Sequence, residues 1–117
     1  MGGIRQWWEE NRDKTQRFYN DVLHAMGTAP YYAEPWICEK IVGQHLASPS
    51  MLCILPLQDW LSIDGELRRK NPLEEQINVP ANPRHYWRYR MHMTMENLLG
   101  QETFNHRLRD MIKASGR

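Results

Sequence analysis

The stretch from Ile77 to Arg90 brings together the residue types best suited to hold a polar ligand. Two prolines, Pro80 and Pro83, stiffen it, because proline fixes φ at about −65° and makes the preceding residue extended. Asparagine amides lie among the prolines, and a basic-aromatic run follows at once, His85-Tyr86-Trp87-Arg88-Tyr89-Arg90. The stretch therefore predicts a rigid loop. Such a loop either binds a polar ligand or fastens itself to a domain, and its own residues leave both interpretations open.

The overall composition limits the classes of protein that need consideration. A chain of 117 residues with 41% hydrophobic residues is one small domain or a piece of a larger one, and it is too apolar to be disordered. The net charge of +1 provides no long-range field toward nucleic acid or an anionic membrane. Cys38 and Cys53 lie in apolar runs, which indicates reduced core thiols. With no membrane span or signal peptide evident, we expect a cytoplasmic protein without a membrane partner.

Two helices are expected in the first half of the chain. Apolar residues recur at helical spacing over residues 4–26, after a Met1-Gly2-Gly3 start that is a poor opening for a helix. A second helix is expected over residues 35–46, with Pro35 in its first turn. His45 falls on the apolar stripe of that helix. It is interpreted as a core histidine, because no second His or Cys follows at the spacing that a helical metal site needs.

A buried strand is expected next, over residues 51–57. This continuous apolar run is bounded by proline and serine, which is typical of a strand buried on both faces of a parallel sheet. A helix followed by such a strand is half of a β/α repeat. Gln58 and Asp59 then follow the strand's carboxyl end, where α/β proteins place ligand groups.

The last part of the chain reads as a long irregular segment and then helix. Residues 94–114 are expected to form terminal helices, with Thr94 as the N-cap and Gly100 as a break between two pieces. The chain contains no glycine-rich phosphate loop, no Cys-x-x-Cys and no His-Glu-x-x-His motif. Taken alone, the chain should be mostly α-helical, with one short buried strand.

Five short motifs, in this order, give the chain a resemblance to a known enzyme family. The motifs are Ile4-Arg5-x-Trp7-Trp8-Glu9-Glu10, Glu34-Pro35-Trp36-Ile37, Pro56-Leu57-Gln58-Asp59, Ile77-Asn78-Val79-Pro80 and His85-Tyr86-Trp87-Arg88-Tyr89-Arg90. With them the chain resembles the C-terminal end of the 4-α-glucanotransferases, the amylomaltases or disproportionating enzymes of glycoside hydrolase family 77, and within them the long plant-cytosolic and Bacteroides-like branch.

The resemblance implies a parent of the α/β class, a (β/α)8 TIM barrel that transfers α-1,4-glucan segments between acceptors in starch or maltodextrin metabolism. Residues 1–117 would be a single incomplete unit of that barrel, with 51–57 as a barrel strand and 58–93 as a substrate-side loop. The family works by retaining double displacement with an Asp nucleophile and a Glu acid/base, which requires two carboxyl groups roughly 5–5.5 Å apart. No metal or organic cofactor is implied.

The residues carried over from the family are few. Asn78 matches the Asn of an Asn-x-Pro loop that contacts sugar hydroxyls, and an amide can both donate to and accept from such groups. A role in fastening the loop stays open beside it. Trp87 matches a family tryptophan, for which packing against the barrel is favoured over stacking on a sugar. No Asp or Glu of this chain, Asp59 included, matches a catalytic position, so the isolated chain is expected to be inactive.

Two other classes of function remain in view. The chain could be a helical interaction module or the complementing half of a split barrel, whose aromatic faces need the rest of the barrel or self-association to be covered. Binding of single-stranded nucleic acid by Arg84, Trp87, Arg88, Tyr89 and Arg90 is disfavoured, because the net charge is low and no second basic strip supports it.

Overall fold

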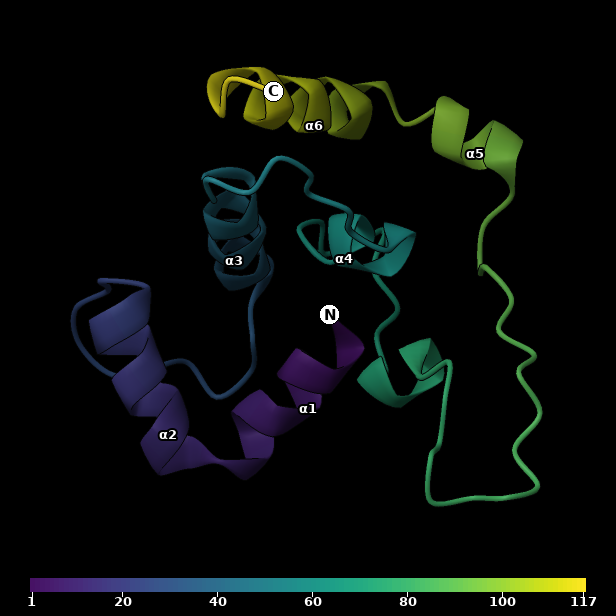
Figure 1. The fold of residues 1–117 in the computed structure, drawn as a ribbon, viewed down its shortest axis with the longest axis horizontal. Coiled ribbons are helices and arrows are strands. Elements are labelled where there is room, and N and C mark those ends of the chain that lie inside the picture. The colour runs from purple at the N-terminus through teal and green to yellow at the C-terminus, as the bar shows by residue number, and fades with distance from the viewer.

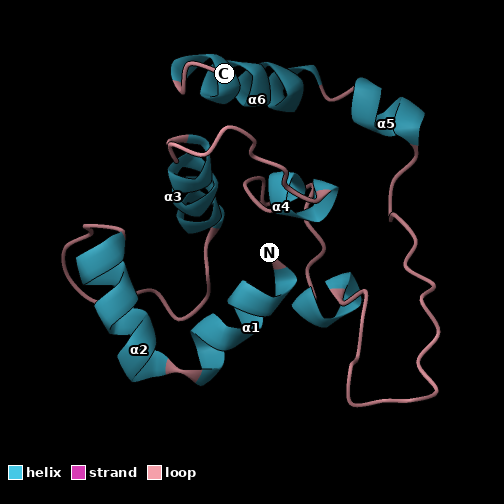
Figure 2. Ribbon diagram, viewed as in Figure 1, coloured by secondary structure: helices cyan, strands magenta, loops and turns pink.

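The computed structural model describes every residue from Met1 to Arg117, and its regular structure is entirely helical (Figure 2). The predominance of helix agrees with the expectation for the isolated chain, but the predicted strand is absent. In chain order the elements are α1 (Gly2–Glu10), α2 (Arg12–Arg17), the π-helical turn η1 (Phe18–Val22), α3 (Pro35–Leu46), α4 (Leu57–Leu61), the 3-10 turn η2 (Pro72–Glu75), α5 (Met95–Leu99) and α6 (Glu102–Ala114).

Helix α1 begins at Gly2, inside the segment that was expected to precede the helix. The reason is close packing of α1 against η2 (Figure 1). A Cβ on Gly2 would lie 2.8 Å from the carbonyl oxygen of Pro72 and 2.9 Å from the Cβ of Glu75. Glycine is therefore required at this contact, although it is a weak helix former.

The single helix predicted over residues 4–26 is wrong, because the structure divides it. Asn11 leaves helical geometry at φ −121° and ψ 55°, and its side-chain amide donates to the carbonyl of Trp7 at 3.1 Å. Asparagine side chains compete with the backbone in this way and so interrupt helices. The helix also ends early, since η1 closes at Val22 and His24 adopts a positive φ of 50°.

Helix α3 spans Pro35–Leu46 and stands between the two halves of the hydrophobic core. Toward the N-terminal elements it buries Ile37, Cys38 and Ile41. Toward α4 and α6 it buries Val42 and Leu46. The residues that complete the first cluster are Trp8, Tyr19, Leu23, Ala29 and Ala33, and those that complete the second are Leu61, Ile63 and Phe104.

The strand predicted over residues 51–57 is not formed. Residues 51–56 carry no regular structure, and Leu57 is already the first residue of α4. The segment is also largely exposed, with Leu52 at 73% and Ile54 at 85% of their full accessible surface. A strand needs a neighbouring strand to satisfy its N–H and C=O groups, and this chain contains none to pair with.

The terminal part contains α5 and α6, with the turn between them at Gly100 and Gln101. Phe104 anchors α6 in the core, and the Arg107 guanidinium binds the carboxylate of Glu39 on α3. Before α5, the expected loop over residues 58–93 is interrupted by α4 and η2. The irregular remainder, from Gln76 to Met93, runs out from the helices and returns to α5 (Figure 1).

Candidate functional site

The loop that carries Asn78 is closed by hydrogen bonds from other residues. The Nε2–H of His85 donates to the carbonyl of Ile77 at 2.9 Å, across the base of the loop. Inside it, the backbone N–H of Asn82 donates to the carbonyl of Val79 at 2.9 Å. The side-chain oxygen of Asn82 in turn accepts from the backbone N–H of Arg84 at 3.0 Å. Asn82 and His85 therefore fasten this loop.

The Asn78 side chain is exposed and takes no part in these hydrogen bonds. Its amide can therefore offer both donors and its acceptor to a ligand in solution. Of the two roles that the sequence left open for Asn78, the fastening role belongs to Asn82 and His85 in this structure.

Arg69 joins the far side of the loop to the helical body. Its guanidinium donates to the carboxylate of Glu74 at 2.8 Å and to the carbonyl of Arg90 at 2.7 Å. It also lies over the ring of Tyr89, with 5.8 Å between Cζ and the ring centroid. A second link is the Nε2–H of His92, which donates to the carbonyl of Leu67 at 2.6 Å. These contacts hold the returning segment of the loop, residues 89–92, against the segment that precedes η2.

A cavity of about 390 Å³ lies between Arg69 and the loop. Its lining is rich in guanidinium groups and tyrosine rings and has a single carboxylate, that of Glu74. The remaining lining residues are Gln76, Ile77, His85, Tyr86, Arg88, Tyr89 and Arg90. Asn78 follows the lining residue Ile77 directly in the chain but does not itself line the cavity.

Trp87 does not line the cavity, and 70% of its surface is exposed. The packing role favoured for Trp87 is therefore not seen within this chain, where the indole is largely exposed to solvent. The exposed indole is free to contact either a larger protein surface or a ligand.

Other residues singled out in the sequence lie away from the loop. Gln58 and Asp59 belong to α4 rather than to the end of a strand, and the Asp59 carboxylate binds the amino group of Met1. His45 was predicted to lie in the core, but it is exposed at the surface of α3, where its Nδ1–H donates to the carbonyl of Ile41 at 2.9 Å. The structure contains no group of His, Cys, Asp and Glu that could hold a metal ion.

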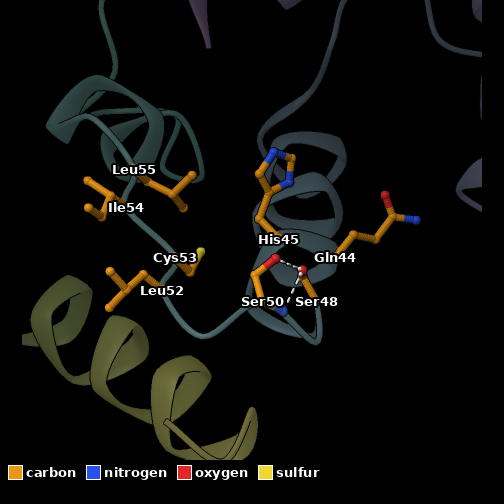
Figure 3. A pocket seen from close by; sticks show the side chains of 8 residues that line it. All are labelled: Gln44, His45, Ser48, Ser50, Leu52, Cys53, Ile54 and Leu55. Atoms are coloured by element: carbon orange, nitrogen blue, oxygen red, sulfur yellow. Dashed lines mark hydrogen bonds between the residues drawn. The ribbon is translucent and has the colours of Figure 1, made fainter.

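A second cavity, of about 450 Å³, lies where α3 ends and the exposed apolar segment begins (Figure 3). Ser48 and Ser50 face each other there, with 2.9 Å between their hydroxyl oxygens. The ring of His45 points away from this pair and along α3 (Figure 3). A serine nucleophile needs a base within hydrogen-bond reach, so this cavity lacks the arrangement for nucleophilic catalysis.

Two of the buried or half-buried carboxylates, Glu75 and Glu39, are held in ion pairs with arginine. The side chain of Glu75 is 3% exposed and lies 3.5 Å from the Arg5 guanidinium, which also donates to the carbonyls of Arg69 and Lys70, each at 2.9 Å. Burial lowers the pKa of Arg5 from its ordinary value. Glu39 is paired with Arg107. None of these pairs opens into the cavity beside Asn78.

Sequence reasoning missed the part that Arg69 plays. The run Arg68-Arg69-Lys70 has the composition of a solvated surface segment, yet Arg69 lines the cavity and binds the carbonyl of Arg90 on the loop. No local pattern marks this arginine, because its partner Arg90 is 21 residues further along the chain. The sequence marked His85 only as a member of the basic-aromatic run, and nothing in it predicted the hydrogen bond from His85 to Ile77.

Comparison with known proteins establishes the family. A family model described as 4-alpha-glucanotransferase matches residues 1–95. The chain belongs to the 4-alpha-glucanotransferase family. It is 38% identical over 114 residues to 4-alpha-glucanotransferase DPE2 of Oryza sativa subsp. japonica, a match that covers 97% of this chain and 12% of the rice protein. The chain thus spans 12% of the length of this curated relative, and no solved structure matches it. The resemblance that the five motifs carried is confirmed.

The match to the family model includes the whole loop with Asn78 and Trp87, and it ends at Met95. Residues 96–117 fall outside it and contain most of α5 and all of α6. None of the helices is long and apolar enough to cross a membrane.

Proposed function

We propose that this chain is the C-terminal part of a 4-α-glucanotransferase that moves α-1,4-glucan segments between acceptors. The observation that carries the proposal is the family match over residues 1–95, together with the similarity to the rice enzyme over nearly the whole chain. The rice protein is far longer, which supports the interpretation that this chain works as one part of a larger barrel. Its substrates would be maltooligosaccharides or longer α-1,4-glucans, and it would act in the cytoplasm without a cofactor.

Within that enzyme we assign Asn78 to substrate binding. An exposed amide on a loop that other residues hold rigid is pre-organised, so little entropy is lost when a sugar binds. Its two donors and its acceptor suit neighbouring sugar hydroxyls. Trp87 is the weaker candidate, because an exposed indole fits both a sugar face and the surface of the missing barrel.

The chemistry itself would come from residues outside this chain. Retaining transfer needs a nucleophilic carboxylate and an acid/base carboxyl group roughly 5–5.5 Å apart. The cavity beside Asn78 has one carboxylate, Glu74, and that group is already paired with Arg69 at 2.8 Å. On this proposal the loop positions the glucan, and carboxylates elsewhere in the enzyme cleave it.

This assignment is tested by incubating the purified 117-residue chain with maltotriose and following the release of glucose and of longer maltodextrins. We expect neither product. Clear turnover by the pure chain would show that it holds its own catalytic carboxylates, and that the proposal of a non-catalytic part is wrong.

A second candidate function, an interaction module or complementing half of a split barrel, is favoured by the exposed apolar segment after α3. Met51, Leu52 and Ile54 are 92%, 73% and 85% exposed, which is unusual for three large apolar residues so close together in the chain. We expect concentration-dependent self-association in light scattering coupled to size exclusion. The double variant Leu52→Ser/Ile54→Ser should reduce it, whereas Leu99→Ser, a change at a similarly exposed leucine on α5, should not. A compact monomer at all concentrations argues against this candidate.

A further inference from the structure

The cavity between Arg69 and the loop has an excess of positive charge that the protein does not neutralise. No Asp or Glu occurs from Gln76 to Thr94. The one carboxylate in the lining, Glu74, is bound to Arg69. Arg88 and Arg90 also line the cavity, and neither forms a salt bridge. Two guanidinium groups thus border one small space without an anionic partner.

The same cavity has polar atoms that lack partners within the protein. The Nε of Arg69 and the hydroxyl of Tyr89 are both buried without a hydrogen bond of good geometry, and their side chains lie against each other, with 5.8 Å between the Arg69 Cζ and the Tyr89 ring centroid. A buried polar group without a partner is unfavourable, so a bound molecule that supplied an oxygen atom to these groups would be stabilised. Both atoms can donate, and an anionic oxygen is the acceptor that fits them best.

An aromatic face lies beside the guanidinium groups. Tyr86 is 72% exposed, and the Cζ of Arg88 lies 4.9 Å from its ring centroid. The contact holds the Arg88 guanidinium in one orientation, which reduces the entropy lost when it binds a ligand. The ring also offers an apolar surface within reach of anything bound to Arg88.

We propose that this cavity binds a sugar carrying a phosphate monoester. The phosphate would lie between Arg88 and Arg90, because planar guanidinium groups bind phosphate oxygens in pairs, and the sugar ring would rest against Tyr86. The volume of about 390 Å³ lies within the about 300–1,000 Å³ of small-molecule sites. The phosphate follows from the arginines alone, while the choice of a sugar as its carrier rests on the proposed function.

A nucleic-acid phosphate is the competing source of the same anion. Single-stranded nucleic acid is bound along a positively charged groove that follows several nucleotides. Here the unpaired guanidinium groups surround one cavity, and the net charge of the whole chain is only +1. The arrangement therefore favours a single phosphate on a small ligand.

The test is a titration of the full 117-residue chain, followed by backbone amide NMR, with glucose 6-phosphate, glucose and inorganic phosphate. We expect glucose 6-phosphate to bind more tightly than either of the others and to shift amides from Tyr86 to Arg90. Arg88→Gln and Arg90→Gln should each weaken this binding about tenfold, the effect of losing one charge-assisted hydrogen bond. Arg84→Gln is the matched control, since it removes the same charge from the same loop outside the cavity lining and should leave binding within about twofold.

Three results would overturn the inference. They are equal binding of glucose and glucose 6-phosphate, equal binding of inorganic phosphate and glucose 6-phosphate, and tighter binding of a short single-stranded DNA. Unchanged affinity in Arg88→Gln and Arg90→Gln would equally exclude the cavity as the site.

Because both arginines are exposed, the variants should fold, and their amide spectra show directly whether they do. A separate titration with maltotriose, compared in Asn78→Ala, reports on the proposed function, so failure of one proposal is distinguishable from failure of the other.

Discussion

The Nε2–H of His85 donates a hydrogen bond to the carbonyl of Ile77 at 2.9 Å, and so closes the loop on which Asn78 stands. The two partners are eight positions apart in the chain, and the loop between them holds Pro80 and Pro83. A rigid loop with a free amide at its rim is the feature of this chain that best suits recognition of a polar ligand.

Replacing His85 should loosen this loop while leaving the rest of the fold intact. In His85→Ala we expect faster hydrogen exchange of the amides from Asn78 to Arg84, because the closing hydrogen bond is lost. A bond of this kind contributes about 0.5–1.5 kcal/mol, and this one is remote from the core, so the midpoint of thermal unfolding should change little. His106→Ala, at an exposed histidine on α6, is the control and should leave the exchange of these amides unchanged. Equal exchange in His85→Ala and the wild type would show that the bond does not hold the loop.

The adjacent glycines at the start of α1 should respond in opposite directions to alanine. Gly2→Ala places a Cβ 2.8 Å from the carbonyl oxygen of Pro72 and should destabilise the fold by about 1–3 kcal/mol. Gly3→Ala meets nothing within 4 Å and should stabilise the fold by up to about 1 kcal/mol, since alanine favours helix. Urea unfolding of both variants measures the difference. Similar free energies of unfolding would contradict the close contact between α1 and η2.

Removing one partner of the buried Arg5–Glu75 pair should destabilise the protein strongly. Their side chains are 7% and 3% exposed, so Arg5→Met leaves a buried carboxylate without its counter-charge. Such a change costs about 3–5 kcal/mol. Replacing both, as in Arg5→Met/Glu75→Leu, should recover part of the loss, because no unpaired charge is then buried. Arg17→Met, at an exposed arginine on α2, controls for the loss of charge. If the double variant is less stable than Arg5→Met, the penalty does not come from the unpaired carboxylate.

The buried thiol of Cys38 should make the fold less stable at alkaline pH. Burial raises the pKa of Cys38, because the thiolate is disfavoured inside the core. In the unfolded chain the thiol ionises at about pH 8.5, so the unfolded state binds fewer protons than the folded state above that pH. Stability from this group is therefore complete below about pH 8.5 and falls as the pH rises further. Unfolding measured from pH 7 to pH 10 should show this fall in the wild type and a shallower one in Cys38→Ala. Equal slopes would contradict a buried, neutral thiol.

Local sequence signals predicted the elements whose causes are local. Pro35 stands in the first turn of α3, Thr94 caps α5 by accepting from the N–H of Asn97 at 3.2 Å, and Gly100 lies between the terminal helices. The division of the first helix at Asn11 could not be read from apolar spacing, because that spacing continues across the break. The segment over residues 51–57 has the composition of a buried strand but no strand beside it in this chain.

In the candidate site, too, the features with local causes were predictable and those that depend on long-range contacts were not. The loop and Asn78 were visible in the prolines and amides of the sequence, whereas the cavity depends on Arg69 meeting Arg90 across 21 residues. No periodicity or short motif in the sequence predicts a contact between residues so far apart in the chain. His45 was misplaced for a related reason: it lies at the edge of the apolar stripe of α3, where apolar spacing alone does not decide whether a side chain is buried or exposed.

The most direct measurement is the rate of glucose release from maltotriose by a chimera. In it, the aligned segment of the rice 4-alpha-glucanotransferase is replaced by the matching 114 residues of this chain. We predict that the folded chimera is active and that Asn78→Ala lowers its kcat/KM about tenfold, the effect of losing hydrogen bonds to a sugar. Asn20→Ala, at an exposed asparagine far from the loop in the chain, should leave the rate unchanged. A folded chimera without activity, or one that Asn78→Ala leaves unaffected, would contradict the account.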